Sequence, residues 1–389
     1  MKITAVKTVI VNAEMRNWVF VKVETDEPGL FGWGEASLEW KTRAVVGAVE
    51  DLAPMAIGED PTRIEHLYQK LYRQSFWRLG VIGMSAISAM EQACWDILGK
   101  SLGVPVYRLL GGAVRDRVRM YTHLGGGSMK AVYETFDPAP LIDLAQQVVA
   151  RGYTALKVVF VPYSEPLMGA AYVKRLGQLM QNLRLAVGEG VDIMIDFHGR
   201  AYPAMAIQYI NAVAEFSPFF CEEPVPPENV AALREVRQAV RVPIATGERL
   251  VTRHQFREIF EQQACHVIQP DLCHCGGLLE GKKIAAMAEA YYMGVAPHNP
   301  LGPVANAAAL QFALSTPNFL IQEDMLTDVP WRWDVVQNPL QTRDGYWLKS
   351  EKPGLGVEVN EQEAAKHPFQ QEVMHSTTIR AADGAILDW

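Results

Sequence analysis

The chain has 389 residues, of which 49% are hydrophobic and 21% charged, an ordinary globular composition that excludes a disordered or fibrous protein. Its formal net charge is −8, with 36 basic against 44 acidic residues. Nucleic acids and anionic membranes select basic surfaces, so this balance argues against either as a partner. No apolar run approaches the roughly 18 residues that a membrane-spanning helix needs.

Cysteine usage and the first residues predict a cytoplasmic protein. The five cysteines are few and odd in number, which is typical of reduced thiols rather than of a disulfide framework. Lys7, Asn12 and Glu14 interrupt the apolar character of the first residues, so we expect no signal peptide.

Residues 1–115 are expected to form an α+β domain. Residues 2–11 and 18–25 alternate in the manner of strands. A long, largely apolar helix is predicted over 85–102, ended by Gly103.

From about residue 118 short apolar runs alternate with segments long enough for a helix. Such alternation indicates a parallel sheet, and eight runs suggest a closed barrel, here assigned to residues 116–335. Residues 336–389 lack this rhythm and are expected to pack back on the first domain. The three glycines Gly125-Gly126-Gly127 match no phosphate-binding motif and are expected to form a turn. The eight runs are 118–121, 155–160, 192–196, 219–221, 244–246, 265–268, 294–297 and 319–321.

Six polar residues follow six successive runs, at spacings of 26, 26, 23, 27 and 25 residues, about the length of one βα unit. In a barrel, the carboxyl ends of the strands hold the active site, and polar residues there are typical of catalysis. Acidic residues after strands also cap helices, but six in phase favour a site. The six are Asp196, Glu222, Glu248, Asp271, His298 and Glu323.

Carboxylates that converge on one point repel one another and need a cation. An all-oxygen site suits Mg²⁺ or Mn²⁺ rather than Zn²⁺. The cluster Cys273-His274-Cys275, with Cys265 nearby, matches no common zinc spacing, so we expect structural thiols.

Two histidines stand beside these carboxylates. His198 follows Asp196 by two residues, so an extended backbone would point both to one side. His298 follows the run next to that of Asp271. An aspartate bonded to a histidine fixes its tautomer and raises its basicity, which makes His298 a candidate general base.

A series of short motifs runs along nearly the whole chain. They are Gly32-Trp33-Gly34-Glu35, Met84-Ser85-Ala86-Ile87, Trp95-Asp96-Ile97, Gly111-Gly112, Asp196-Phe197-His198-Gly199-Arg200, Glu222-Glu223-Pro224, Gly247-Glu248-Arg249, Gln269-Pro270-Asp271, Gly276-Gly277, Ala296-Pro297-His298, Leu301-Gly302-Pro303 and Lys352-Pro353-Gly354-Leu355-Gly356. With them the chain resembles the enolase superfamily, mandelate racemase branch, and is most similar to the galactonate dehydratase group of acid-sugar dehydratases.

The resemblance implies a fold, a metal and a type of chemistry. The fold would be a modified (β/α)7β TIM-like barrel under an α+β capping domain built from both ends of the chain. Mg²⁺ would be held by Asp196, Glu222 and Glu248, and the reaction would begin with removal of a proton beside a carboxylate. Members of this branch are usually homo-oligomers, so the resemblance also implies a homo-oligomer.

One departure from the pattern of this branch restricts the reactions that we expect. Racemases of this branch carry Lys-x-Lys on the second barrel strand, whereas this chain has Lys157-Val158-Val159, and Val159 cannot take a proton. With one strong base, two-base racemisation is disfavoured and β-elimination favoured. In the galactonate group the counterpart of His198 is the general acid for the departing hydroxyl.

These features predict the dehydration of an aldonate to a 2-keto-3-deoxy acid. His298, oriented by Asp271, would take the C2 proton, and His198 would protonate the C3 hydroxyl. Lys157 and Glu323, together with Mg²⁺, would stabilise the enediolate, the device shared across this superfamily.

Mannonate and gluconate dehydratases are the nearest alternatives. Likeness to the mannonate enzymes is visible in Arg16-Asn17 and in residues 383–389, but those enzymes lack the dyad aspartate and carry Arg where this chain has Lys157. Glu39 fits the galactonate group better.

The substrate contacts are expected from Arg16, Glu39, Trp77 and His123, in loops that surround the site. An epimerase or cycloisomerase acting on another carboxylate would use the same metal and dyad. Outside enzymes, the alternative is an inactive metal-binding barrel.

Overall fold

The computed structural model describes residues 1–124, 138–326, 328–373 and 379–389. The run Gly125-Gly126-Gly127 and its predicted turn lie outside these residues. Among the described residues no helix has the length and apolar character needed to cross a membrane.

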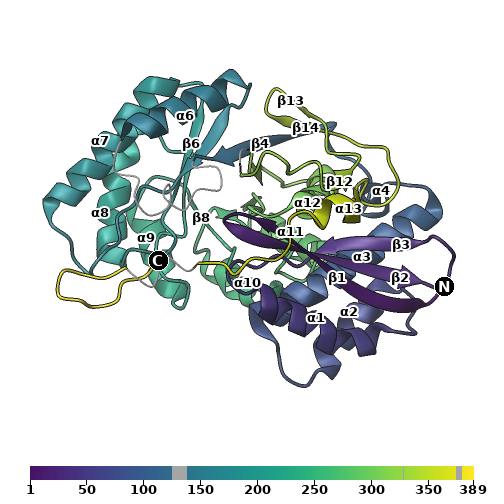
Figure 1. Cartoon of the computed structure of the whole chain (residues 1–389). Helices are drawn as coiled ribbons and strands as arrows, with labels where there is room; N and C mark the ends of the chain where they lie inside the picture. Colours follow the sequence, from purple (N-terminus) through teal and green to yellow (C-terminus); the bar gives the residue numbers. More distant parts are fainter. Residues whose placement is uncertain (125–137, 327, 374–378) are drawn as a thin grey trace.

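The N-terminal part is an antiparallel sheet, in the order β1-β2-β3, that packs on helices (Figure 1). The two predicted strands and the helix end at Gly103 are confirmed, and Gly103 has the left-handed φ of 68° common at such ends. The elements are β1 (Ile3–Ala13), β2 (Arg16–Thr25), β3 (Phe31–Glu35), α1 (Thr42–Ala56), α2 (Ile64–Gln74), α3 (Gly80–Leu102) and α4 (Val106–Leu109).

The third strand, β3, was not predicted, because Gly32 and Gly34 weaken its strand pattern. The glycines serve packing instead. A Cβ on Gly34 would lie 1.9 Å from the carbonyl oxygen of Ala89 in α3, and one on Gly32 would lie 2.1 Å from that of Ala93. Only glycine lets β3 approach the α3 backbone this closely.

The next part is a closed parallel barrel. Neighbouring strands pair in chain order from β4 to β10, and β11 pairs in parallel with β4. A parallel bridge from Val295 to Phe319 joins β10 to the segment before β11. The strands are β4 (Arg117–His123), β5 (Ala155–Val158), β6 (Asp192–Asp196), β7 (Phe220–Glu222), β8 (Ile244–Thr246), β9 (Val267–Ile268), β10 (Gly294–Val295) and β11 (Gln322–Asp324).

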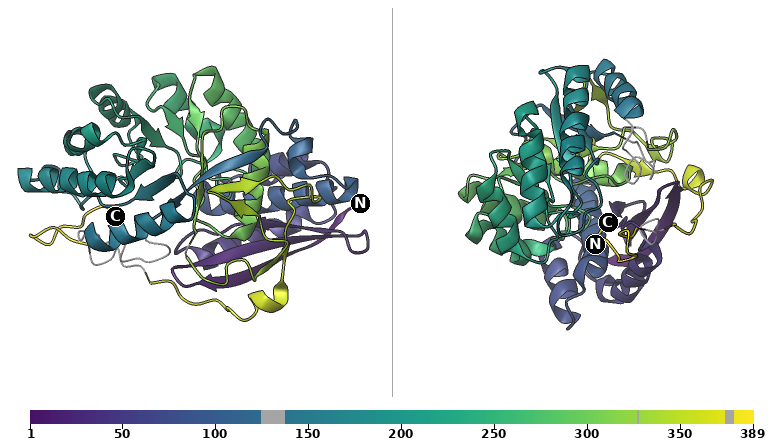
Figure 2. Two further views of the ribbon diagram at one scale, coloured as in Figure 1. Left: turned by 90° about the horizontal axis from the view of Figure 1, so that it is seen from above. Right: turned by 90° about the vertical axis from the view of Figure 1, so that its left-hand side faces the viewer.

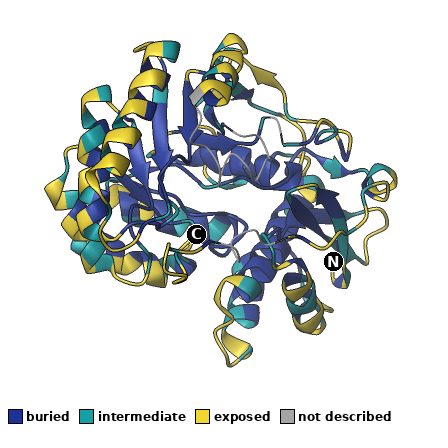
Figure 3. Cartoon of the chain, turned by 60° about the vertical axis from the view of Figure 1, so that its left-hand side comes forward, coloured by how far each residue is buried: buried dark blue, intermediate teal, exposed yellow. Residues whose placement is uncertain are grey.

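A helix follows each of the first seven barrel strands, and these helices form the outer wall, with exposed outer faces around buried strands (Figure 3). The predicted (β/α)7β barrel is thus confirmed. The helices are α6 (Pro138–Ala150), α7 (Ala170–Val187), α8 (Pro203–Val213), α9 (Val230–Ala239), α10 (Thr252–Gln262), α11 (Leu278–Ala290) and α12 (Pro303–Ser315). A short 3-10 turn, η1 (Ala214–Phe216), extends α8.

The last strand differs from its predicted position. We expected it at 319–321, but β11 begins at Gln322. Phe319 bridges to Val295, and the amide of Leu320 donates to the Val295 carbonyl at 2.8 Å, so these residues close the barrel before the strand that pairs with β4.

An apolar plug fills the barrel beneath the polar strand ends. It takes one buried side chain from each strand or its flank. Because side chains two residues apart share a face of a strand, Met194, Phe220 and Ile321 lie directly below Asp196, Glu222 and Glu323. The plug residues are Tyr121, Ala155, Met194, Phe220, Ala245, Val267, Ala296 and Ile321.

The C-terminal segment contacts both other parts. Strand β14 pairs with β4 of the barrel, while the amide of Asn12 in the cap donates to the carbonyl of His367 at 2.8 Å. The end of the chain lies over the barrel half, away from α13 (Figures 1 and 2). The elements of the segment are β12 (Val336–Gln337), β13 (Thr342–Arg343), β14 (Tyr346–Leu348), β15 (Glu358–Val359) and α13 (Glu361–Ala364).

Glu35 fastens the cap to the barrel. Its buried carboxylate, at the end of β3, accepts hydrogen bonds from the amides of Gly302 at 2.6 Å and Ala305 at 2.8 Å, at the start of α12, and from the Ser37 hydroxyl at 2.6 Å. A carboxylate there satisfies amides that the helix itself leaves unpaired. His298 lies four residues before Gly302, so this contact also anchors the chain that carries it.

Replacing Glu35 with Ala leaves these buried amides without an acceptor. We expect the free energy of unfolding to fall by about 2–4 kcal/mol, seen as a lower urea midpoint. As a control, Glu24→Ala removes only the surface ion pair with Lys7 (2.8 Å) and should cost at most about 1 kcal/mol. Equal midpoints for the two variants would contradict this role of Glu35.

Candidate active site

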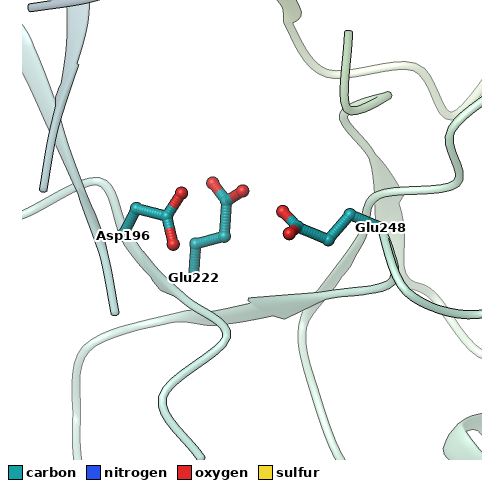
Figure 4. Close-up of side chains that lie close together, drawn as sticks. All are labelled: Asp196, Glu222 and Glu248. Atoms are coloured by element: carbon teal, nitrogen blue, oxygen red, sulfur yellow. The ribbon is translucent and has the colours of Figure 1, made fainter. Parts of the chain in front are cut away.

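Three carboxylates meet at the carboxyl ends of adjacent strands. Asp196 ends β6, Glu222 ends β7, and Glu248 comes two residues after β8. One oxygen from each lies within 4.8 Å of the others, and Figure 4 shows the side chains pointing toward one another. Sequence spacing predicted polar residues at these strand ends, and the resemblance to the enolase superfamily implied these three as the metal ligands.

Lys157 of β5 supplies positive charge beside this cluster. Its Nζ lies 3.2 Å from Asp196 Oδ2, 3.0 Å from Glu222 Oε1 and 2.6 Å from Glu323 Oε1. Burial alone would lower the pKa of Lys157, but the attraction of Glu222 and Glu323 raises it well above its usual range. One ammonium therefore serves several buried carboxylates.

The donor set fits a hard divalent cation. Burial and repulsion from Asp196 raise the pKa of Glu222 well above its usual range, which means that the ionised form needs more positive charge nearby. Glu222 Oε2 is buried and accepts no hydrogen bond from any described residue. Three carboxylates with a free buried oxygen match the ligands that Mg²⁺ prefers.

The cysteines form no such group. Within the described ranges, Cys273, His274 and Cys275 are not part of any cluster that could hold a metal, and all five cysteines are buried free thiols. The Gln92 amide lies 3.6 Å from Cys273 Sγ, as a packed structural thiol would allow.

His298 and Asp271 form a hydrogen-bonded pair. His298 Nδ1 lies 2.8 Å from Asp271 Oδ2, and Nε2 faces the carboxylates, 3.6 Å from Glu248 Oε2. The amide of Cys273 donates to Asp271 Oδ1 at 2.7 Å and fixes the carboxylate. Burial alone would lower the pKa of His298, but Glu248 and the bond to Asp271 raise it well above its usual value.

His198 lies beside Asp196, as expected, but its backbone is not extended. Its φ is 50°, in the left-handed region, and its amide donates to Asp196 Oδ1 at 2.9 Å. This local turn brings His198 Nε2 to 3.2 Å from Asp196 Oδ2. A left-handed non-glycine residue costs about 1 kcal/mol or more and recurs at functional sites.

Glu323 joins the two sides of the site. Its Oε1 pairs with Lys157, and its Oε2 accepts the amide of Asn299, the residue after His298, at 2.9 Å. The loop that carries the histidine is thereby tied to the cluster.

A pocket opens above these groups, and its lining combines strand ends of the barrel with cap residues. Arg16 and Glu39 form an ion pair at its rim, and Arg16 also donates to the carbonyl of Pro300 at 2.6 Å. The lining residues are Met15, Arg16, Glu39, Trp40, His123, Lys157, Asp196, His198, Glu248, Arg249, His298, Pro300, Glu323, Met325 and Trp389.

Turn geometry brings Arg16 to the pocket. Strands β1 and β2 pair up to Ala13 and Arg16, so Glu14 and Met15 form a two-residue hairpin turn. Glu14 has a φ of 59°, as such turns require. The hairpin tip therefore reaches over the barrel.

Trp77 is the predicted substrate contact that the structure does not bring to the pocket. It lies between α2 and α3, is 73% exposed and packs edge-on against Phe76, with ring centroids 5.0 Å apart. The neighbouring residues predict a loop there but not the direction in which it faces.

Sequence reasoning also missed lining residues. The last residue, Trp389, lies with its ring centroid 4.5 Å from that of Trp40 and 5.3 Å from that of His198. Arg249 also lines the pocket, and its place directly after Glu248 is a signal that could have identified it. Its Nε donates a hydrogen bond to Glu223 at 2.9 Å. Residues 383–389 resemble the mannonate enzymes, but that likeness did not place Trp389 in the pocket.

Comparison with known proteins matches this architecture. Residues 2–111 match the mandelate racemase / muconate lactonizing enzyme N-terminal domain, and residues 140–363 match the enolase C-terminal domain-like family. A D-galactonate dehydratase from Verminephrobacter eiseniae is 40% identical over 400 residues, covering all of both chains. One from Xanthomonas euvesicatoria is 38% identical over 96% of each chain.

Solved structures of similar proteins share this fold. An enolase from Pantoea ananatis with bound D-gluconate and Mg has a TM-score of 0.89 and 31% identity, covering 100% of this chain and 99% of that one. A mandelate racemase/muconate lactonizing enzyme-like protein from Roseovarius sp. TM1035 has a TM-score of 0.89 and 36% identity, over 96% and 97% of the two chains. The chain therefore belongs to the mandelate racemase / muconate lactonizing enzyme family of the enolase superfamily.

Proposed function

We propose that this protein catalyses the Mg²⁺-dependent dehydration of a sugar acid, a galactonate-like aldonate, to a 2-keto-3-deoxy acid. The observation that carries the proposal is the His298–Asp271 pair facing a three-carboxylate cluster in one pocket. The names of the D-galactonate dehydratase relatives support the substrate class. Val159, where racemases of this branch carry a lysine, supports elimination over racemisation.

Asp196, Glu222 and Glu248 would hold the cation. When bound, Mg²⁺ supplies positive charge that stabilises the anion formed beside the substrate carboxylate, since a proton at that position is very weakly acidic. Lys157, already among these carboxylates, adds a second positive charge on the same side. Glu323 holds the Lys157 ammonium in place.

His298 is the proposed general base. Its Nδ1 proton is donated to Asp271, which leaves Nε2 as the basic atom on the pocket side. Nε2 must be unprotonated to accept the C2 proton, and the Glu248 charge opposes this because it raises the pKa of His298. Neutralising the charge of Glu248 would lower the pKa of His298, so that Nε2 loses its proton and can act as the base.

His198 is the proposed general acid. It follows β6, and His298 follows β10, so four strand steps of an eight-strand ring separate them. Both line one pocket, and a substrate between them would meet the base on one side and the acid on the other. His198 would protonate the C3 hydroxyl as it leaves, and the enol would tautomerise to the 2-keto acid.

The rest of the substrate would meet the cap. D-Galactonate and D-gluconate share their configuration at C2 and C3 and differ at C4, so the reacting centre cannot tell them apart. We assign this discrimination to Arg16 and Glu39, with neutral His123 as a hydrogen-bonding partner for a hydroxyl. Burial, reinforced by Lys157, lowers the pKa of His123 to about 3.

The test is a screen of aldonic and aldaric acids with Mg²⁺, with the 2-keto product trapped by semicarbazide. D-Galactonate, D-gluconate and D-mannonate form the key set, because they separate the C4 and C2 centres. Product from one of these acids is expected. No product from any acid, with metal bound, would contradict the proposal.

The three carboxylates should determine the affinity for the metal. Asp196→Asn, Glu222→Gln and Glu248→Gln should each weaken Mn²⁺ binding by more than about tenfold in calorimetric titration, because each removes charge from an all-carboxylate site. Glu289→Gln, on the barrel helix α11, is the matched control. Binding unchanged in all three site variants would refute the assignment.

The two histidines should differ in their effect on exchange of the C2 proton. His298→Asn should lower kcat by at least about 10²-fold and abolish exchange of the C2 proton with solvent D₂O. His198→Asn should lower product formation but leave C2 exchange, because the base remains. Retained C2 exchange in His298→Asn would remove His298 from this role.

His123 should stay neutral over the range of pH in which an ordinary histidine titrates. Since the pKa of His123 is about 3, its ring should stay neutral down to pH 5, and its ¹⁵N shifts should not change between pH 5 and pH 8. The His123→Gln variant assigns the signal. A midpoint near the ordinary histidine value of about 6.5 would contradict the buried environment described above.

A further inference from the structure

Glu372 is a buried carboxylate in the C-terminal segment that the reaction scheme leaves unused. It is 8% exposed. Its Oε1 accepts the backbone amides of Asn17 at 3.2 Å and Trp40 at 3.1 Å, and its Oε2 accepts the Thr42 hydroxyl at 2.9 Å. Among the described residues, no lysine, arginine or histidine pairs with it.

The two amides belong to the two cap segments that line the pocket. Asn17 follows Arg16 at the start of β2, and Trp40 follows Glu39 in the segment before α1. One carboxylate oxygen therefore holds the backbones next to both members of the rim ion pair. The Asn17 side chain adds to this contact, donating to the Gln370 carbonyl at 2.9 Å.

The same chain end returns to the pocket. Trp389 packs on Trp40, whose amide Glu372 binds, and on His198 of the barrel. The hairpin, the segment before α1 and the chain end thus form one wall that is joined at Glu372.

We propose that Glu372 is a positioning residue that sets the spacing of Arg16 and Glu39 and thereby the affinity for the distal part of the substrate. This inference rests on the proposed function. The metal ligands and both histidines stand on the barrel and make no contact with Glu372, so its loss should act on KM rather than on kcat.

The experiment compares Glu372→Ala, Glu372→Gln and Glu361→Ala, using the best acid from the screen. Glu372→Ala should raise KM by roughly tenfold or more, the cost of leaving buried donors without an acceptor, and change kcat by less than about threefold. Glu372→Gln keeps a carbonyl oxygen for both amides and should restore KM. Glu361→Ala removes only the segment's surface pair with Lys22 (2.6 Å) and should leave KM unchanged.

Hydrogen exchange read by mass spectrometry gives a second readout that needs no substrate. In Glu372→Ala the amides of Asn17 and Trp40 should exchange faster, in peptides covering 12–20 and 36–44, and Glu372→Gln should slow them again. If no acid is turned over, the proposed function fails while this measurement still decides whether Glu372 holds the two segments.

The proposal is overturned if Glu372→Ala keeps the KM and exchange of the parent protein, or if kcat falls as much as KM rises. Should Glu372→Ala fail to fold, Thr42→Val removes one of the three contacts. It should raise KM a few-fold while Glu372→Gln does not. An unchanged KM in Thr42→Val would then overturn the proposal.

Discussion

Repulsion between buried carboxylates is the constraint on which this structure depends. Asp196, Glu222, Glu248 and Glu323 lie at or near strand ends of one barrel, and Lys157 pairs with three of them, Asp196, Glu222 and Glu323. Burying ionised groups in low dielectric is costly unless charges are paired. The cluster therefore needs further positive charge, which a divalent cation bound by these oxygens would supply. The His298–Asp271 pair lies beside it.

The barrel and the cap both line the pocket, and each holds the other in place. Glu35 of the cap holds the start of α12, just after the loop of His298, while Asn299 ties that loop to Glu323. In the other direction, the tail that leaves the barrel region binds the cap through Glu372. Residues far apart in sequence thus hold together a pocket whose titratable groups lie at strand ends.

Sequence was informative where the fold repeats and uninformative where distant segments meet. The regular βα length put six polar residues at strand ends. Four of them line one pocket, and the other two, Glu222 and Asp271, lie next to members of those four. The sequence could not reveal the left-handed turn at His198, because this turn depends on a local hydrogen bond to Asp196. Trp389 and Trp77 show the same limit: the first lines the pocket from the chain end, and the second is exposed and does not line it.

The most direct test of the account is turnover of D-galactonate with Mg²⁺ in D₂O, read by NMR. Removal of the C2 proton, loss of the C3 hydroxyl and tautomerisation would give a 2-keto-3-deoxy acid with one deuterium at C3. Substrate recovered with deuterium at C2, without any keto product from this or the related aldonates, would contradict elimination and point to an epimerase.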